Sequence, residues 1–152
     1  MCDTERLCVR KSLLAGAGCG LFVKTPFFKG EVVCDYKSPE GIMATAEAMK
    51  LEDKSYLMRL GPQTYVDLRQ HPSAVARYVN DCRDTSAHNA QFVKIPKEGR
   101  AEVVATRNIA QDEEVFVDYG RWYWAGSKML PSRLRPTIQL PLPQQPQHCS
   151  SR

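Results

Sequence analysis

The chain has 152 residues, of which 43% are hydrophobic and 25% are charged, and its formal net charge is +4. This composition fits one globular domain, and so mild a charge does not require a nucleic-acid partner. No run approaches the roughly 18 apolar residues that cross a bilayer, and Met1–Arg6 carries acids where a signal peptide needs a basic and then an apolar stretch. We therefore expect an intracellular protein that is not secreted, has no membrane partner and does not read a nucleic-acid sequence directly.

The cysteines and histidines form no pattern that is typical of a metal site. Six cysteines occur along the chain, and no two stand at the CxxC spacing of a zinc site. The three histidines, His71, His88 and His148, are equally scattered. We therefore expect free thiols in a reducing compartment and no bound metal.

Short apolar runs alternate with turn residues along most of the chain, which indicates a mostly β fold. The runs that predict strands are 21–23, 31–36, 56–60, 64–68, 89–95, 101–106 and 115–119. Gly61–Gln63 and Pro96–Gly99 predict two hairpin turns. Residues 44–50, and those that follow Pro72, predict short helices.

Composition also suggests the domain boundaries. Residues 11–125 are predicted to form the folded domain, with residues 1–10 as an N-terminal extension. In residues 126–152, prolines alternate with glutamines and serines, and apolar periodicity is lost. That tail is predicted to be disordered.

Three segments carry unusual residues in a fixed order. Ala15–Val23 has three alternating glycines directly before a predicted strand, and glycine lets a backbone approach a ligand closely. Arg77–Cys82 contains an Asn-Asp pair and is soon followed by His88 and a second asparagine. Glu113–Gly120 begins with two acids and ends on Tyr119 and a glycine.

Each segment alone has an ordinary explanation. Glycines suit a tight turn, the pair Asn80-Asp81 suits an Asx turn, and a tyrosine on a strand usually packs and hydrogen-bonds. A phosphate-binding loop is disfavoured, because it needs a strand before the glycines and a helix after them. The interpretation therefore depends on the three segments together.

In this order, the three segments resemble the SET-domain family of protein-lysine methyltransferases, in its compact form without pre-SET or post-SET zinc modules. The resemblance covers about residues 11–124. It implies a fold of several small β-sheets with short helices and a knot-like C-terminal segment. It also implies S-adenosylmethionine as the cofactor, a lysine in a protein, such as a histone tail, as the substrate, and the nucleus as the location.

In this family, the glycine segment lays its backbone against the cofactor, and the Arg-x-Val-Asn segment meets the cofactor's methionine and adenine parts. Asn80 can offer both a donor and an acceptor to the zwitterionic methionine end, whereas Asp81 is expected to use its main chain. The cofactor-binding residues that the resemblance implies are Ala17, Gly18, Cys19, Gly20, Tyr56, Arg77, Asn80 and Asp81.

Methyl transfer to lysine requires an aligned, neutral amine and oxygen acceptors around the methyl group. The resemblance implies Tyr119 and Tyr36 as catalytic residues, and Tyr36, Val117 and Trp122 as the lining of the lysine channel. Val117 stands where the family usually has Phe or Tyr. Because valine cannot hold a water that restricts the amine, we expect that di- or trimethylation is possible.

Two positions depart from the family pattern. Asp81 stands where the family usually has histidine, and His88 stands where it has the proline before Asn89. Because Asp81 cannot copy the contact of a histidine ring, a second hypothesis stays open, that of a SET domain that binds a protein partner without catalysis. A third, an unrelated β-rich binding module, requires three ordered matches by chance.

Overall fold

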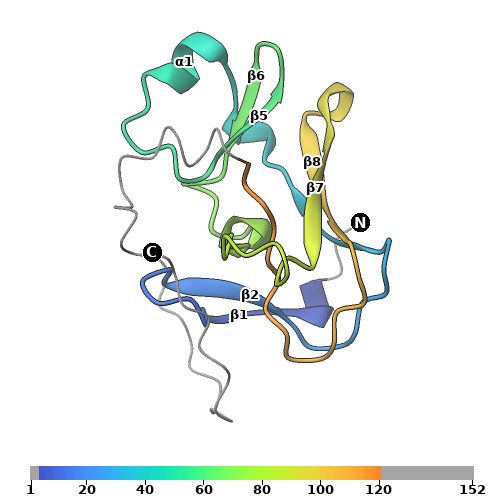
Figure 1. Ribbon diagram of the computed structural model, residues 1–152. Helices are drawn as coiled ribbons and strands as arrows, with labels where there is room; N and C mark the ends of the chain where they lie inside the picture. Colours follow the sequence, from blue (N-terminus) through green and yellow to red (C-terminus); the bar gives the residue numbers. More distant parts are fainter. Residues whose placement is uncertain (1–3, 121–152) are drawn as a thin grey trace.

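The computed structural model describes residues 4–120 (Figure 1). Trp122, expected in the lysine channel, and the predicted tail of residues 126–152 lie outside the described residues. Within the described part the fold is mostly β, as predicted. It consists of three small antiparallel sheets joined by loops and short helices.

The smallest sheet pairs β1 (Leu7–Lys11) with β2 (Cys19–Val23). All five residues of β2 are buried, which explains its continuous apolar sequence. Because β1 begins at Leu7, residues 7–10 of the expected N-terminal extension belong to this sheet. The sequence does not predict β1, because the charged residues Arg10 and Lys11 are not typical of strands. The strand forms because it pairs with β2.

The second sheet has the order β3-β8-β7, and the third has the order β4-β6-β5. The strands of the second sheet are β3 (Val32–Tyr36), β7 (Ala90–Ile95) and β8 (Arg100–Ala105). Those of the third are β4 (Ile42–Ala44), β5 (Leu57–Gly61) and β6 (Thr64–Asp67). Both predicted hairpins, β5-β6 and β7-β8, are confirmed. In β8 buried and partly exposed residues alternate, as expected of a strand with one face on the core.

The helices of the described chain are all short. The α-helix α1 (Thr45–Met49) follows β4, and the Glu47 carboxylate accepts a hydrogen bond from the main-chain N–H of Ala44 at 3.1 Å. The other helices in residues 4–120 are 3-10 turns: η1 (Thr4–Arg6), η2 (Pro39–Gly41), η3 (Val75–Tyr78) and η4 (Pro96–Glu98). The helix expected after Pro72 is therefore the single 3-10 turn η3.

The strand expected at 115–119 does not form, and the structure corrects this prediction. The segment 113–119 makes isolated bridges, Glu114 with Phe22 and Phe116 with Asn80, and no ladder. The Val115 N–H donates to Leu21 of β2 at 2.8 Å, and the Val117 N–H donates to Asn80 at 3.0 Å. This extended segment, orange in Figure 1, thus lies between β2 and residue 80 and joins the three sequence motifs.

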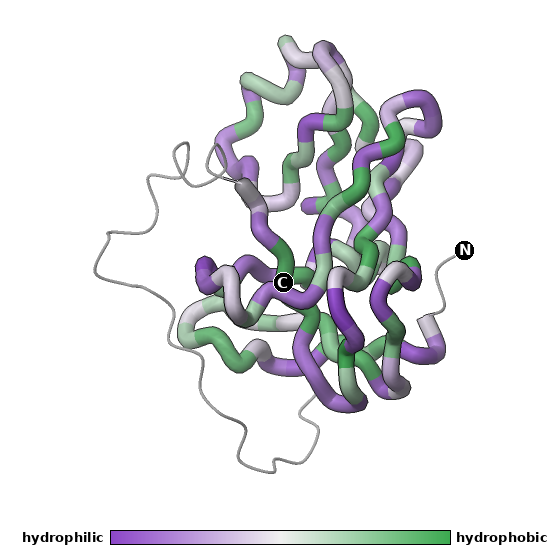
Figure 2. Tube along the Cα trace, turned by 45° about the vertical axis from the view of Figure 1, so that its right-hand side comes forward, coloured by the Kyte–Doolittle hydropathy of each residue, from purple (hydrophilic) through white to green (hydrophobic). Residues whose placement is uncertain are grey.

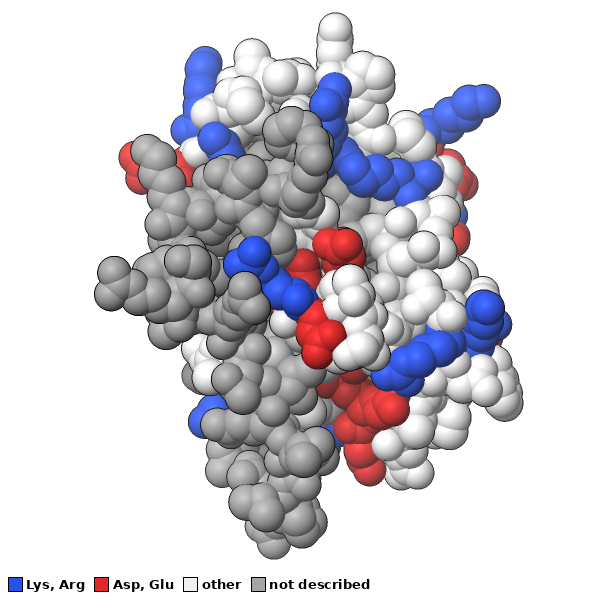
Figure 3. Space-filling model, in the orientation of Figure 1, with Lys and Arg blue, Asp and Glu red and all other residues white. Residues whose placement is uncertain are grey.

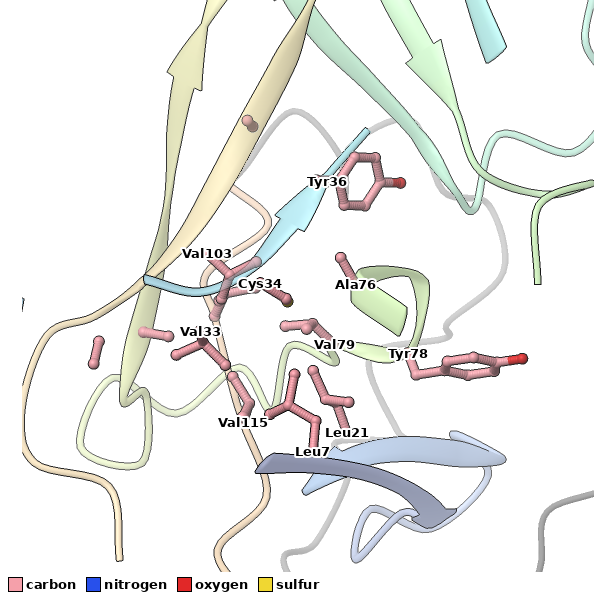
Figure 4. Packing of buried hydrophobic residues seen from close by; sticks show 14 of the residues in the cluster. Leu7, Leu21, Val33, Cys34, Tyr36, Ala76, Tyr78, Val79, Val103 and Val115 are labelled. Carbon is pink, nitrogen blue, oxygen red and sulfur yellow. The ribbon is translucent and has the colours of Figure 1, made fainter. Parts of the chain in front are cut away.

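One hydrophobic cluster connects the sheets (Figure 4). It combines Leu7 and Leu21 of the smallest sheet with Val33 and Val103 of the second and with Val79, directly after η3. Polar and apolar stretches alternate along the described chain (Figure 2). None of the helices in residues 4–120 has the length and apolar character that a membrane crossing requires.

Candidate functional site

The glycine segment forms a compact loop before β2. The Ser12 N–H donates to the Gly18 carbonyl at 2.7 Å, and the Ala17 N–H donates to Leu14 at 3.2 Å. Gly18 has a φ of 73°, in the left-handed region that side chains other than glycine rarely adopt. The glycine at this position therefore sets the path of the main chain from residue 17 into β2.

Gly20 has a different role, because it makes room for an acid. A Cβ built on Gly20 would lie 2.1 Å from Oε1 of Glu114. The absence of a side chain at position 20 lets the Glu114 carboxylate lie directly against β2. The sequence implies a cofactor contact for Gly20, and the contact with Glu114 is not visible in it.

Glu114 is the centre of a buried hydrogen-bond network. Its side chain is 2% exposed and accepts hydrogen bonds from the Ser12 hydroxyl at 2.6 Å, the Leu13 N–H at 2.8 Å and the Asn80 amide at 3.2 Å. Burial raises the pKa of Glu114 above its ordinary value, although these donors act in the opposite direction. The carboxylate thus fastens the glycine loop to the Asn80 segment.

Asn80 connects all three motifs. Its Nδ2 donates to the Cys19 carbonyl at 2.9 Å and to Glu114 Oε1 at 3.2 Å, while its main-chain carbonyl accepts from the Val117 N–H. Because both partners of Nδ2 are acceptors, the orientation of the amide is fixed. Within the described residues Asn80 Oδ1 makes no hydrogen bond, so it is the acceptor that a ligand can use.

Asn89 is a second buried asparagine, to which sequence analysis assigned no role. It is 1% exposed, its Nδ2 donates to the Glu114 carbonyl at 2.8 Å, and its Oδ1 accepts from the Phe116 N–H at 2.8 Å. The amide therefore fastens the main chain of Glu114 and Phe116 to the residue directly before β7. The signal in the sequence was only the presence of an asparagine after His88.

Arg77 places a positive charge in the interior beside two aromatic rings. It is 5% exposed, and its guanidinium carbon lies 4.6 Å from the ring centre of Tyr56 and 5.3 Å from that of Tyr78. Its buried Nε has no hydrogen-bond partner, and no ion pair involves Arg77 in the part of the chain that the structure describes. A buried cation without a carboxylate is costly, so this group is suited to an anionic ligand.

An aromatic row joins the two candidate catalytic tyrosines. The Tyr36 ring meets Phe92 edge-on at 5.6 Å, and Phe92 stacks with Tyr119 at 6.4 Å and 16°. The Tyr36 hydroxyl donates to the Tyr56 carbonyl at 2.5 Å, and the Tyr119 hydroxyl donates to the Val79 carbonyl. Phe92 was absent from the predicted site, because one phenylalanine on a strand carries no signal of its own.

Val117 lies inside the core cluster that also contains Tyr36, and it is 0% exposed. Its neighbour Tyr119 is partly buried and packs against the same cluster. Tyr36 and Val117, the two candidate channel residues that the structure describes, therefore belong to the same core cluster. Trp122, the third, lies outside the described residues.

Asp81, Cys82 and His88 form the one group in residues 4–120 whose donor atoms could surround a metal ion, with those atoms within 4.8 Å of one another. The structure also gives them protein partners. Asp81 Oδ1 lies 2.8 Å from His88 Nε2, and the Cys82 thiol points to the Asp84 carbonyl at 3.5 Å. Burial raises the pKa of Cys82, which favours the thiol over the thiolate that binds metals. Hydrogen bonding therefore accounts for the arrangement.

The cysteines only partly follow the expectation of free thiols. Cys8, Cys34 and Cys82 carry free thiols. Cys19 is disulfide-bonded, so the expectation is wrong at this position. Its main-chain carbonyl, which accepts from Asn80, is the part of Cys19 that joins the network described above.

The described site residues from the sequence form one connected set. The glycine loop meets Asn80, Asp81 Oδ2 accepts the Tyr119 N–H at 3.0 Å, and Tyr36 meets Tyr56, which lies under Arg77. The residues that sequence reasoning missed are Ser12, Asn89, Phe92 and Glu114. They act through tertiary contacts between segments far apart in the chain.

The sequence matches the family described as SET domain over residues 18–120. Three curated relatives carry the name "Histone-lysine N-methyltransferase, H3 lysine-4 specific". Those of Yarrowia lipolytica and Eremothecium gossypii are each 29% identical to this chain over 106 residues, and that of Kluyveromyces lactis is 27% identical. The match covers 66% of this chain but only 9%, 11% and 10% of these relatives, so the chain spans about a tenth of their length.

Proposed function

Since this chain belongs to the SET-domain family, we propose that it is an S-adenosylmethionine-dependent protein-lysine N-methyltransferase that acts on a histone lysine. The observation that carries the proposal is the meeting of three distant sequence motifs in one hydrogen-bonded site. The glycine loop, Asn80 and the segment that ends in Tyr119 contact one another directly. None of the ordinary explanations of the separate motifs requires this convergence.

The residues fit the amino-acid end of S-adenosylmethionine. That end is a zwitterion, and the described part of the site offers one unused acceptor and one unpaired cation for it. Asn80 Oδ1 would accept a hydrogen bond from the ammonium, and Arg77 would pair with the carboxylate. This pairing would supply the buried guanidinium with the counter-charge that the described residues do not provide.

The main chain would hold the rest of the cofactor. The loop of Ala17, Gly18, Cys19 and Gly20 has the left-handed glycine and the small residues that let a backbone lie against a ligand. The Tyr56 ring already lies against the Arg77 guanidinium and would contact the cofactor beside it. Asp81 would contribute its main chain, because its carboxylate is engaged elsewhere.

S-adenosylmethionine supplies the activated methyl group when it is bound. The chain's own part is to position the amine and to offer oxygen acceptors. The Tyr119 hydroxyl donates a hydrogen bond to the Val79 carbonyl, which fixes the direction of the hydroxyl, and its oxygen would accept weak CH···O contacts from the methyl group. The Tyr36 hydroxyl is engaged in the same way by the Tyr56 carbonyl.

The aromatic row would also favour the neutral amine that the reaction needs. A free lysine has a pKa of about 10.4, and burial against apolar groups disfavours its ammonium form. Tyr36, Phe92 and Tyr119 supply such a surface, with Val117 packed into the core beside them. Trp122 remains part of the proposed channel from the sequence alone.

The product is proposed to extend beyond monomethyl-lysine. Val117 is fully buried and offers no hydroxyl that could hold a restrictive water beside the amine. Mass spectrometry of a long incubation is expected to detect dimethyl- or trimethyl-lysine. A product that stays monomethylated to completion contradicts the role assigned to Val117.

The histone substrate follows from the names of the relatives, which are H3 lysine-4 specific enzymes. The face in Figure 3 shows acidic side chains grouped at its centre, with basic ones directly to their left, above them and to the right. A lysine- and arginine-rich peptide would find opposite charges at that centre. A nuclear location belongs to the same proposal.

A radiolabelled methyl-transfer assay tests the function. Core histones and a mixed protein lysate are offered separately, together with S-adenosylmethionine. Label on a histone H3 lysine supports the whole proposal, and label only in the lysate retains the enzyme but rejects the histone substrate. Cofactor and peptide binding without transfer would favour the non-catalytic SET domain instead.

A further inference from the structure

The two positions at which this chain departs from the family pattern contact each other. Asp81 and His88 are seven residues apart in the sequence, yet Asp81 Oδ1 lies 2.8 Å from His88 Nε2. Both side chains are largely removed from water, with 1% of the Asp81 side chain and 13% of the His88 side chain exposed. The two substitutions therefore form one structural unit.

The Asp81 carboxylate is surrounded by donors. Oδ1 accepts the Arg83 N–H at 2.7 Å as well as the His88 ring, and Oδ2 accepts the Tyr119 N–H at 3.0 Å. Because an ionised carboxylate only accepts hydrogen bonds, His88 Nε2 must carry a proton in this contact. His88 thus holds one oxygen of Asp81 in place while the other oxygen holds the main chain of Tyr119.

Tyr119 is consequently attached at both ends to one short segment. Its main-chain N–H is bound by Asp81, and its hydroxyl donates to the carbonyl of Val79. Between them, the Asn80 carbonyl accepts the Val117 N–H at 3.0 Å. Residues 79–81 therefore determine where the tyrosine ring and its hydroxyl lie.

We propose that Asp81 and His88 form a positioning pair that fixes the main chain of Tyr119 and so orients its hydroxyl. The pair acts through Tyr119 and not on the substrate, and its catalytic consequence rests on the proposed methyltransferase function. It accounts for the presence of an acid at position 81 together with a histidine at position 88. Asp81 and His88 should therefore be interdependent.

The kinetic test compares His88→Ala, His88→Gln and Asp81→Asn with the wild-type chain. The glutamine side chain of His88→Gln keeps an N–H that can reach the Asp81 carboxylate, whereas alanine removes it. His71→Ala is the matched control, because His71 also faces a carboxylate, Glu40, at 3.9 Å but lies outside the site. Asp81→Asn keeps the size of the side chain and is included in case larger truncations unfold the chain.

We expect His88→Ala to lower kcat by about tenfold or more, because small misplacements of a reacting group slow the reaction strongly. The Kd for S-adenosylmethionine should change by less than about twofold. His88→Gln should recover most of kcat, and His71→Ala should match the wild type. In the double variant His88→Ala/Asp81→Asn, the second change should add little to the first. Equal kcat values for His88→Ala and wild type would overturn the proposed positioning pair. So would a double variant in which the effects of the two single changes on kcat are fully additive.

A second readout does not depend on catalysis. Amide hydrogen exchange, followed by NMR, reports the Tyr119 N–H directly, and the Val117 N–H on the same segment serves as internal reference. We expect His88→Ala to speed exchange at Tyr119 and to leave Val117 unchanged. Unchanged exchange at Tyr119 rejects the pair whether or not the chain transfers methyl groups. A wild-type chain that transfers no methyl group, while the exchange result holds, supports the pair and rejects the proposed function.

Discussion

Arg77 and Glu114 are charged residues that the fold removes from water, and their surroundings differ. Glu114 has three hydrogen-bond donors, whereas Arg77 has aromatic faces and an Nε without a partner in the described residues. An acid with three donors serves to connect segments of the fold. A buried guanidinium that has no acid beside it in this part of the chain suggests a ligand that brings the negative charge.

Arg77→Met is expected to weaken the binding of S-adenosylmethionine without lowering the stability of the fold. Removing an unpaired buried charge should leave the melting temperature unchanged or raise it. Loss of a charge-assisted hydrogen bond should raise the Kd for S-adenosylmethionine by about tenfold or more. Calorimetry measures the Kd, and Arg107→Met, at an exposed arginine paired with Glu113, is the control. An unchanged Kd in Arg77→Met contradicts the role given to Arg77.

Among single residues, the motif positions could be predicted from the sequence, whereas their partners could not. Gly18, Asn80 and Tyr119 stand in recognisable local patterns. Glu114 is one of two adjacent acids, and only the structure distinguishes it, at 2% exposed, from its more exposed neighbour Glu113. Because that distinction depends on β2 and residue 12, a local pattern does not contain it.

At the scale of elements, the site depends on close packing between β2 and the segment 113–119. At Gly20, the Glu114 carboxylate occupies the space that a side chain would need. The carboxylate cannot move away easily, because three donors hold it. A side chain at position 20 would therefore separate the two elements.

Gly20→Ala is expected to lower the free energy of unfolding by about 1–3 kcal/mol, as overpacking in a well-packed interior does. Gly61→Ala is the matched control, since its added Cβ would meet only Pro96 at an ordinary 3.6 Å. Urea unfolding measures both. A loss no larger in Gly20→Ala than in Gly61→Ala would show that the contact with Glu114 is not tight.

Hairpins were the elements that the sequence predicted best, and the segment 113–119 was the one it predicted least well. The turns at Gly61–Gln63 and Pro96–Gly99 set both hairpins locally, and β5-β6 and β7-β8 follow. The apolar run 115–119 has the composition of a strand, but β2 and residue 80 each offer the segment only one bridge. Likewise, β1 depends on its pairing with β2, and its own sequence mixes apolar and charged residues, so it does not predict a strand.

At the scale of the whole molecule, Glu114 connects the smallest sheet, the η3 region and the C-terminal described segment. Burial raises its pKa above the ordinary 4.5, so the folded chain holds this proton more tightly than the unfolded chain does. The stability that this group contributes is complete below the unfolded pKa and is lost as the pH rises through the folded pKa.

Glu114→Gln is therefore expected to change the pH dependence of stability in a defined direction. The difference in unfolding free energy, wild type minus Glu114→Gln, should fall as the pH rises from about 4 towards neutrality. Urea titrations at a series of pH values measure it, and Glu113→Gln controls for the loss of an acid next in the chain. A difference that stays constant or grows with pH would contradict the burial of this carboxyl group.

The fold class was accessible from the sequence because three ordered motifs identify a family whose architecture is shared. The mostly β class and the family are confirmed, while the roles of single site residues remain predictions. The pairing of Asp81 with His88 could not be predicted, because each departure, taken alone, only weakens the match to the family pattern. Their 2.8 Å contact makes them one unit.

Single-turnover methyl transfer by Tyr119→Phe, with Tyr65→Phe as the matched control, tests the central claim most directly. Tyr65 lies on β6, is not among the proposed site residues and loses the same hydroxyl group. We expect Tyr119→Phe to bind S-adenosylmethionine as the wild type does and to transfer its methyl group at least about a hundredfold more slowly, while Tyr65→Phe stays at the wild-type rate. Equal rates for Tyr119→Phe and wild type would contradict the proposed catalytic site.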